Sequence, residues 1–483
     1  MPGFVGFAVH SFALAGIALA FFGIGYPAAA LTLTEALAFA YENSDRLSAA
    51  RDGQKATDEA LPQAKANWFR PTITLSGEEG RTYLKEREAQ RGINSSINLD
   101  AKETTDTTVR QTGYNVTLPL WRGGQTQAAI SAAEAEIGGG QAGLLGTEQD
   151  VLGSVVSAYA DVVYYHALVA IGEAQVKELG RQADLTRELQ QAQRATVTDL
   201  GYARDALAQA RASLATNRGG LRAAGATFEA TVGIPATALD AAPALASLPE
   251  SAEAAVSTAI IDNPDLRTAV RAIDQYTATV RRYEGALLPE INLYHSFTRE
   301  WDKSKYAGSS LLTGSATPYD TVAREDTFKV GVELSMTLYQ GGANHSAVRE
   351  AKATLSEARR TLAFTRATVE GNVKAGWEHL LAAHEALAAY EDSLRELAGV
   401  VDGYRRLYQR GDRTISDLID VIERRNAAQA SIAGARRNVL LAEAQLLRDM
   451  GRLTASGQQL PVMIYDPQLH ASEVGNKWMG LGD

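Results

Sequence analysis

The chain has 483 residues, a formal net charge of -10 and a pI near 5.4. Its basic residues are scattered rather than clustered, which argues against nucleic acid or another polyanion as a partner. It contains no cysteine, which excludes disulfides, thiolate metal ligands, thiol catalysis and a lipidated cysteine anchor.

Residues 1–30 differ in kind from the rest of the chain. An apolar run over residues 4–24 is followed by Pro27 and three alanines, which predicts a signal peptide cleaved after Ala30. Because no Lys or Arg precedes Arg46, a retained transmembrane helix is the alternative. We expect no other helix of about 20 apolar residues, so that any membrane insertion of the mature chain uses β-strands.

The same landmarks recur in the two halves of the chain at one offset. Pro71 and Pro289 differ by 289 − 71 = 218, and the glycine pairs at 123–124 and 341–342 keep that spacing. A constant offset over such a distance predicts a tandem structural repeat. The predicted segments are a first repeat over 31–233, a linker over 234–250, a second repeat over 251–453 and a C-terminal tail over 454–483.

Each repeat is predicted to open with a helix and to end in two long helices. The first helix begins at Thr32, where Glu35 completes a capping box, and runs to about Trp68. Later apolar residues recur three and four apart, except at Arg425, which predicts coiled coils. A helix over residues 342–409 would reach ~100 Å at 1.5 Å per residue. An elongated rod of paired helices follows.

Two strands are predicted between the helices of each repeat. Alternating apolar and polar residues place them at about 71–80, 109–121, 289–300 and 327–339. This pattern is typical of strands in outer-membrane barrels, and polar stretches of roughly thirty residues before Val109 and before Phe328 are predicted to be long extracellular loops.

Four strands are too few for a barrel, because single-chain bacterial barrels begin at eight. Two chains would supply eight strands and three would supply twelve. An eight-stranded barrel is filled by its own side chains, whereas a wider one holds water, so transport favours three chains. The predicted fold class is an α+β membrane protein with four strands per chain, long coiled helices and a two-fold internal repeat.

Two segments carry a family resemblance: 332–342, which reads VELSMTLYQGG, and 411–420, which reads GDRTISDLID. From about Leu31 to Leu453 the chain resembles the TolC family of outer-membrane efflux and secretion proteins. The resemblance implies a homotrimer in the cell outer membrane, without a cofactor, whose twelve-stranded β-barrel continues into a periplasmic α-helical coiled-coil barrel. It also implies docking to a periplasmic adaptor and an inner-membrane ABC or proton-driven transporter. Residues 465–478 resemble the tails of members that serve type I protein secretion, and small-molecule export is the other expected activity.

The resemblance also implies a gate at the turns between the long helices, at about 193–198 and 410–416. Tyr408 and Arg413 are expected to keep this periplasmic entrance closed through links to Asp199 and Thr198. Such exposed polar links are individually worth about 0 to 1 kcal/mol. Several of them, repeated by symmetry, suit an entrance that must open.

Asp417 and Asp420 are three residues apart and share one helical face. In a trimer they would form a ring of six carboxylates, which binds and selects cations. The alternative is that acids in a first turn only complement the helix dipole. Ser416 is the predicted N-cap. Gln193 occupies the position equivalent to Gly411, which predicts that the two turns differ in shape.

An enzyme is not predicted. The glycine pairs lack the lysine and hydroxyl residue of a phosphate loop, and His379 and His384 miss the four-residue spacing of helical metal ligands. Glycines 138–140 should weaken a helix by about 1 kcal/mol each relative to alanine, and no function is assigned to them. Two other classes are considered: a periplasmic adaptor, with one hairpin between lipoyl-like halves, and a structural coiled coil, which leaves the strands unexplained.

Overall fold

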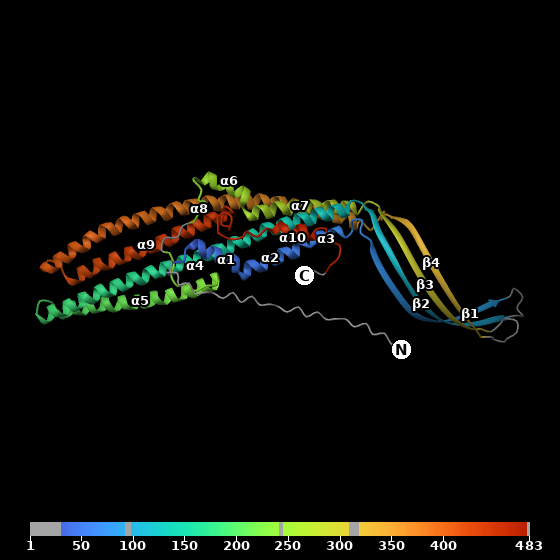
Figure 1. Ribbon diagram of the computed structural model, residues 1–483, viewed down its shortest axis with the longest axis horizontal. Helices are drawn as coiled ribbons and strands as arrows, with labels where there is room; N and C mark the ends of the chain where they lie inside the picture. The colour runs from blue at the N-terminus through green and yellow to red at the C-terminus, as the bar shows by residue number, and fades with distance from the viewer. Residues whose placement is uncertain (1–29, 92–97, 241–244, 309–317, 481–483) are drawn as a thin grey trace, which may run out of the picture.

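The computed structural model describes residues 30–91, 98–240, 245–308 and 318–480. Long helices form a rod, and a curved sheet extends from one end of it (Figure 1). The proposed signal peptide, up to residue 29, lies outside the described residues.

Short helices precede the sheet in both repeats. They are α1 (Leu33–Asn43), α2 (Asp45–Asp58) and α3 (Ala60–Lys65) in the first repeat, and α6 (Ala252–Asp262) and α7 (Pro264–Gly285) in the second. The capping box of Thr32 and Glu35 is present. The single helix expected up to Trp68 is wrong, because Ser44 is extended and its hydroxyl caps α2 at the Leu47 N–H.

Two long hairpins run along the rod to its end far from the sheet (Figure 1). They are α4 (Gln125–Gln191) with α5 (Val197–Val232), and α8 (Ala343–Arg410) with α9 (Ile415–Asp449). The short helices stack beyond α5 and α9, so α4 and α8 are paired along their length (Figure 1). Contrary to expectation, α4 contains a stretch apolar enough to cross a membrane by length and composition. It packs instead against α5, α7 and α9, which explains its apolar character.

The sheet has four antiparallel strands in sequence order: β1 (Thr72–Arg91), β2 (Asn98–Arg122), β3 (Glu290–Gly308) and β4 (Tyr319–Ser335). Each glycine pair turns a strand into a long helix, with φ between 57° and 82° at all four glycines. These backbone values favour glycine, because a Cβ is disfavoured there.

The strands are longer than predicted, and the long-loop prediction is wrong. Most of the polar residues before Val109 and Phe328 continue the strands. Opposite charges on neighbouring strands support this extension: Arg81 pairs with Asp106, and Arg299 with Asp326. The predicted end of the last strand at residue 339 is also wrong. Ser335 pairs with Glu290, the first residue of β3, so the residues after Ser335 have no partner strand in the described part of the chain.

One face of the sheet is apolar across all four strands. Residues that pair directly share a face, and the register aligns the apolar residues of each strand with those of the next. The aligned set, with one histidine among it, is Ile73, Leu75, Tyr114, Val116, Leu118, Ile291, Leu293, His295, Phe297, Phe328, Val330, Val332 and Leu334. On the edge strands these side chains are exposed, Leu75 to 84% and Val332 to 63%. The adjacent row on the other face is polar: Thr74, Asn115, Ser296 and Lys329.

Candidate functional site

The candidate site is the tip of the rod, where both hairpins turn (Figure 1). The two turns have the same hydrogen bonds 218 residues apart: Arg194 N–H donates to Leu189 O at 2.8 Å, and Asp412 N–H donates to Leu407 O at 3.0 Å. Gln193 has φ 60°, close to the 83° of Gly411. The expectation that the turns differ is therefore wrong, since Gln193 adopts the left-handed conformation that glycine adopts more readily.

A capping box begins the returning helix of each hairpin. The Thr196 amide donates to Asp199 at 2.8 Å, and the Thr414 amide donates to Asp417 at 3.1 Å. These bonds to the backbone lower the pKa of Asp417 below its usual value. Ser416 is not the N-cap, because it lies inside α9 and its hydroxyl bonds to that of Thr414.

The predicted gate residues all lie at this tip, but the links predicted between them are not formed within a single chain. Tyr408 packs against the apolar core of the tip, and the Arg413 guanidinium lies 5.4 Å from the centre of the Tyr404 ring. The Asp199 carboxylate is occupied by its own capping box, and Thr198 is exposed. Within the described part of one chain, neither Tyr408 nor Arg413 bonds to Asp199 or Thr198. The predicted links remain a prediction about contacts between chains.

One bond between the hairpins was not predicted. The Tyr202 hydroxyl donates to the Asp420 carboxylate at 2.8 Å, and this bond raises the pKa of Tyr202 to about 12. Asp205 and Glu423 lie near this pair, and burial followed by the charges of Asp420 and Asp205 raises the pKa of Glu423. Asp205, Asp420 and Glu423 therefore form a local acidic cluster beside Tyr202. Among the described residues no group of acids or histidines is placed to hold a metal ion.

A second unpredicted contact between the hairpins lies farther from the tip, toward the sheet. Glu178 on α4 accepts from Arg405 on α8 at 2.9 Å and from Arg425 on α9 at 2.6 Å. The carboxylate is only 15% exposed. The sequence held a signal for this contact, because Arg425 interrupts the apolar spacing of its helix.

The three glycines in α4 allow other elements to approach closely. A Cβ at Gly140 would lie 2.4 Å from Gln54 Oε1, and a Cβ at Gly138 would lie 3.0 Å from Arg271 Nε. Gln54 is buried and donates to Asp58 at 2.7 Å. The glycines therefore have a packing role, seating α2 and α7 against α4.

The C-terminal tail packs on the short helices of the first repeat. It includes α10 (Pro467–Val474), where His470 Nδ1 lies 2.9 Å from the buried Asp58 carboxylate. The Tyr465 amide donates to the Tyr41 hydroxyl at 3.0 Å, and the Arg51 guanidinium lies over both tyrosine rings. The tail thus links the end of α9 to α1 and α2.

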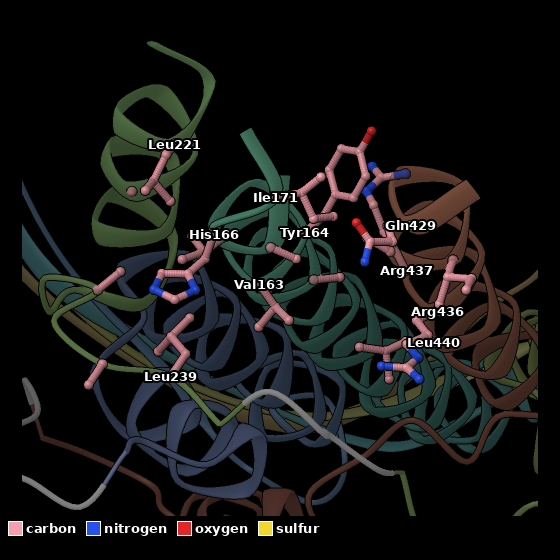
Figure 2. A pocket seen from close by; sticks show the side chains of 18 of the residues that line it. Val163, Tyr164, His166, Ile171, Leu221, Leu239, Gln429, Arg436, Arg437 and Leu440 are labelled. Atoms are coloured by element: carbon pink, nitrogen blue, oxygen red, sulfur yellow. The ribbon is translucent and has the colours of Figure 1, made fainter. Parts of the chain in front are cut away.

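A cavity of about 1160 Å³ lies midway along the rod, between both hairpins and linker residues 236–239. Figure 2 shows Val163 and His166 of α4 facing it, with Leu221 of α5 on one side and Arg436 and Arg437 of α9 on the other. Both arginines have acidic partners, Glu391 and Asp161. The lining offers no paired nucleophile and base, so the cavity does not indicate catalysis.

The sequence profile described as outer membrane efflux protein matches residues 37–233 and 255–452. The chain belongs to the outer membrane efflux protein family. The match covers both repeats and leaves out the segment between them, so the resemblance stated from sequence is confirmed. Members of this family are outer-membrane channels that serve export, and this chain is one of them. The periplasmic adaptor and the structural coiled coil are both wrong, because the chain has two hairpins and a four-stranded sheet.

Two relatives and two solved structures place this efflux protein more closely. It is 29% identical to the outer membrane efflux protein BepC of Brucella suis, over 95% of this chain and 93% of that protein. It is 26% identical to the alkaline protease secretion protein AprF of Pseudomonas aeruginosa, over 62% and 60%. The outer membrane protein VceC of Vibrio cholerae shares the fold with a TM-score of 0.68 at 15% identity, over 87% and 96%. The open state of the Neisseria gonorrhoeae MtrE channel gives 0.64 at 16% identity, over 87% and 88%.

Proposed function

We propose that three copies of this chain form a twelve-stranded β-barrel in the outer membrane, continued by a periplasmic tunnel of coiled helices. The observation that carries this proposal is the apolar face that runs from β1 to β4 without interruption. Lipid is the surface that such an exposed face fits. The outer edges of β1 and β4 have no partner strand among the described residues, and unpaired backbone groups cannot remain inside a bilayer. Copies of the same sheet supply the missing partners.

The absence of native cysteine makes this arrangement testable by disulfide trapping. Thr74→Cys on β1 would be combined in turn with cysteine at Thr327, Lys329, Gly331 or Glu333 on β4, all on the polar face. We expect at least one pair to give a covalent ladder that ends at three chains. Asn115→Cys on the central strand β2, paired with the same positions, is the control and should give none. A ladder ending at two chains, or chains that stay single in every pair, would contradict the trimer.

We propose that the tip docks to a periplasmic adaptor and, through it, to an inner-membrane ABC or proton-driven transporter. The tail favours type I protein secretion, and the likeness to a protease secretion protein supports it. Small-molecule efflux is the second candidate, supported by the likeness to an efflux protein over nearly the whole chain. Deleting the gene and comparing secreted proteins with drug sensitivity separates the two. Loss of a secreted protein with unchanged drug sensitivity would support secretion, and the reverse would support efflux.

We propose further that Thr198, Asp199, Tyr408 and Arg413 close the entrance through contacts between neighbouring chains. Their common location at the tip supports this role, as does their exposed or half-buried position. Asp417 and Asp420 from three chains form the cation-binding ring at the same level.

A further inference from the structure

We propose that Glu178, Arg405 and Arg425, here called the Glu178 clamp, hold the two hairpins of each chain together above the tip and so set how readily the entrance opens. The inference rests on the proposed trimeric channel and adds a positioning residue that the predicted gate does not include.

The clamp joins the two repeats through one carboxylate. Glu178 Oε1 accepts from Arg405 and Oε2 accepts from Arg425, so both oxygens are used and both helices of the second hairpin are held. By contrast, Arg218–Glu173 joins α4 only to α5, and Arg436–Glu391 joins α8 only to α9. Those exposed pairs lie within one hairpin and cannot resist a separation of the two.

The surroundings make the clamp stronger than a surface ion pair. The side chains of Glu178 and Arg425 are 15% and 20% exposed, and the neighbouring residue Leu179 is buried in the apolar core of the tip. Breaking this pair is costly, because each buried charge has lost its hydration and is stabilised by its partners instead. Asn426, which also accepts from Arg425, is 5% exposed, and its amide nitrogen has no hydrogen-bond partner among the described residues. The clamp is therefore a polar centre at the border of an apolar layer.

The position of the clamp links it to opening. Above it, Arg437–Asp161 and Arg448–Asp150 also join α9 to α4, whereas below it the described residues of the tip place one hydrogen bond between the hairpins, Tyr202–Asp420. If the hairpins part at the tip, the Glu178 clamp is the first ion pair between them that must break. Breaking the Glu178 clamp is therefore the step that controls opening of the entrance.

Resting conductance of the purified protein in planar bilayers tests the clamp. Glu178→Gln leaves Arg425 without its acidic partner, whereas Arg405 keeps its exposed pair with Asp402. We expect the open fraction at rest to rise by roughly tenfold or more, since breaking the largely buried Glu178–Arg425 pair has an effect well above that ratio. Arg425→Gln should raise it as well, and the double variant should exceed the larger single effect by little. Glu391→Gln, which breaks a pair within one hairpin, is the matched control and should leave conductance at the parental level.

The outcomes separate the clamp from the channel itself. A Glu178→Gln channel that forms trimers, conducts and rests as closed as the parent would overturn the clamp and leave the channel intact. An equal rise for Glu391→Gln would also overturn it, because any lost ion pair would then act alike. A parent protein that forms no trimeric channel would instead contradict the proposed function. Trimer content by gel mobility, measured for every variant, shows that a change in conductance does not come from failed assembly.

Discussion

Tyr202 donates a hydrogen bond to Asp420, the residue 218 positions later in the chain. This interval equals the offset of the internal repeat, so the bond joins equivalent positions of the two hairpins. Two aspartates at these positions would repel each other, and a tyrosine facing an ionised aspartate supplies a donor for an acceptor. The difference between the two repeats at this position therefore permits a contact that two aspartates could not make.

Tyr202→Phe should raise resting conductance about twofold to fivefold, because it removes one hydrogen bond to a charged group at an exposed site. The bond raises the pKa of Tyr202 from 10.0 to about 12. Its contribution is complete below pH 10 and is lost as the pH rises through 12. Bilayer recordings from pH 8 up to about pH 12 check both points. Parent and variant that open equally at pH 8 would show that this bond does not hold the entrance.

Combining Tyr408→Phe with Arg413→Ser should also raise resting conductance. Both changes remove donors that we place between chains, and several weak links repeated three times act together. The measurement is again bilayer conductance, and Arg410→Ser, an exposed arginine at the end of α8, serves as the control. A double variant as closed as the parent would refute these links.

Asp417→Ala with Asp420→Ala should abolish block of the channel by multivalent cations, because the ring loses all six carboxylates. Asp417 also caps α9, so Asp417→Asn with Asp420→Asn is the better test of charge, since asparagine keeps a capping oxygen. The pKa of Asp417 lies below its usual value, so block should persist at pH 5. An unchanged block in the asparagine variant would assign these acids to the helix dipole alone.

Gly123→Ala should destabilise the fold more than Gly124→Ala. Both glycines have positive φ, but a Cβ at Gly123 would lie 2.3 Å from the carbonyl oxygen of Gly285, whereas one at Gly124 meets nothing within 4 Å. Backbone strain gives about 1–2 kcal/mol in both variants, and the clash adds about 1–3 kcal/mol at Gly123. The temperature at which gel mobility changes on heating measures the difference. Equal temperatures would show that the contact with Gly285 adjusts freely.

His470→Ala should loosen the tail from the first repeat. It leaves the buried Asp58 carboxylate with Gln54 as its remaining described partner, at a loss of about 1–3 kcal/mol. Limited proteolysis should then cut the tail faster than in the parent. His379→Ala, at an exposed position on α8, is the control, and equal cleavage of both variants would remove the role given to His470.

Local patterns predicted most of this fold, and contacts between distant segments account for what they missed. The offset of Pro71 and Pro289 revealed the repeat, because each copy keeps the same turns. The break at Ser44 was missed, since a serine inside a helical pattern becomes a cap only if the chain turns there. Gln193 was misjudged because the hydrogen bonds of the turn outweigh its own preference. The partners of Glu178 lie 227 and 247 residues away. Arg425 interrupts the apolar spacing of its helix, but no spacing within one helix shows that it pairs with Glu178.

In the proposed trimer, the open edges of the four-stranded sheet couple folding of this chain to association. A lone copy carries two rows of unsatisfied backbone groups beside an apolar face, a surface that invites aggregation. If three copies form the barrel as proposed, the native state is reached only when copies meet, and its yield depends on how many are present at once. A variant copy can therefore assemble with parental copies and impair the whole channel. Gate variants are expected to be dominant-negative when they are expressed together with the parental protein.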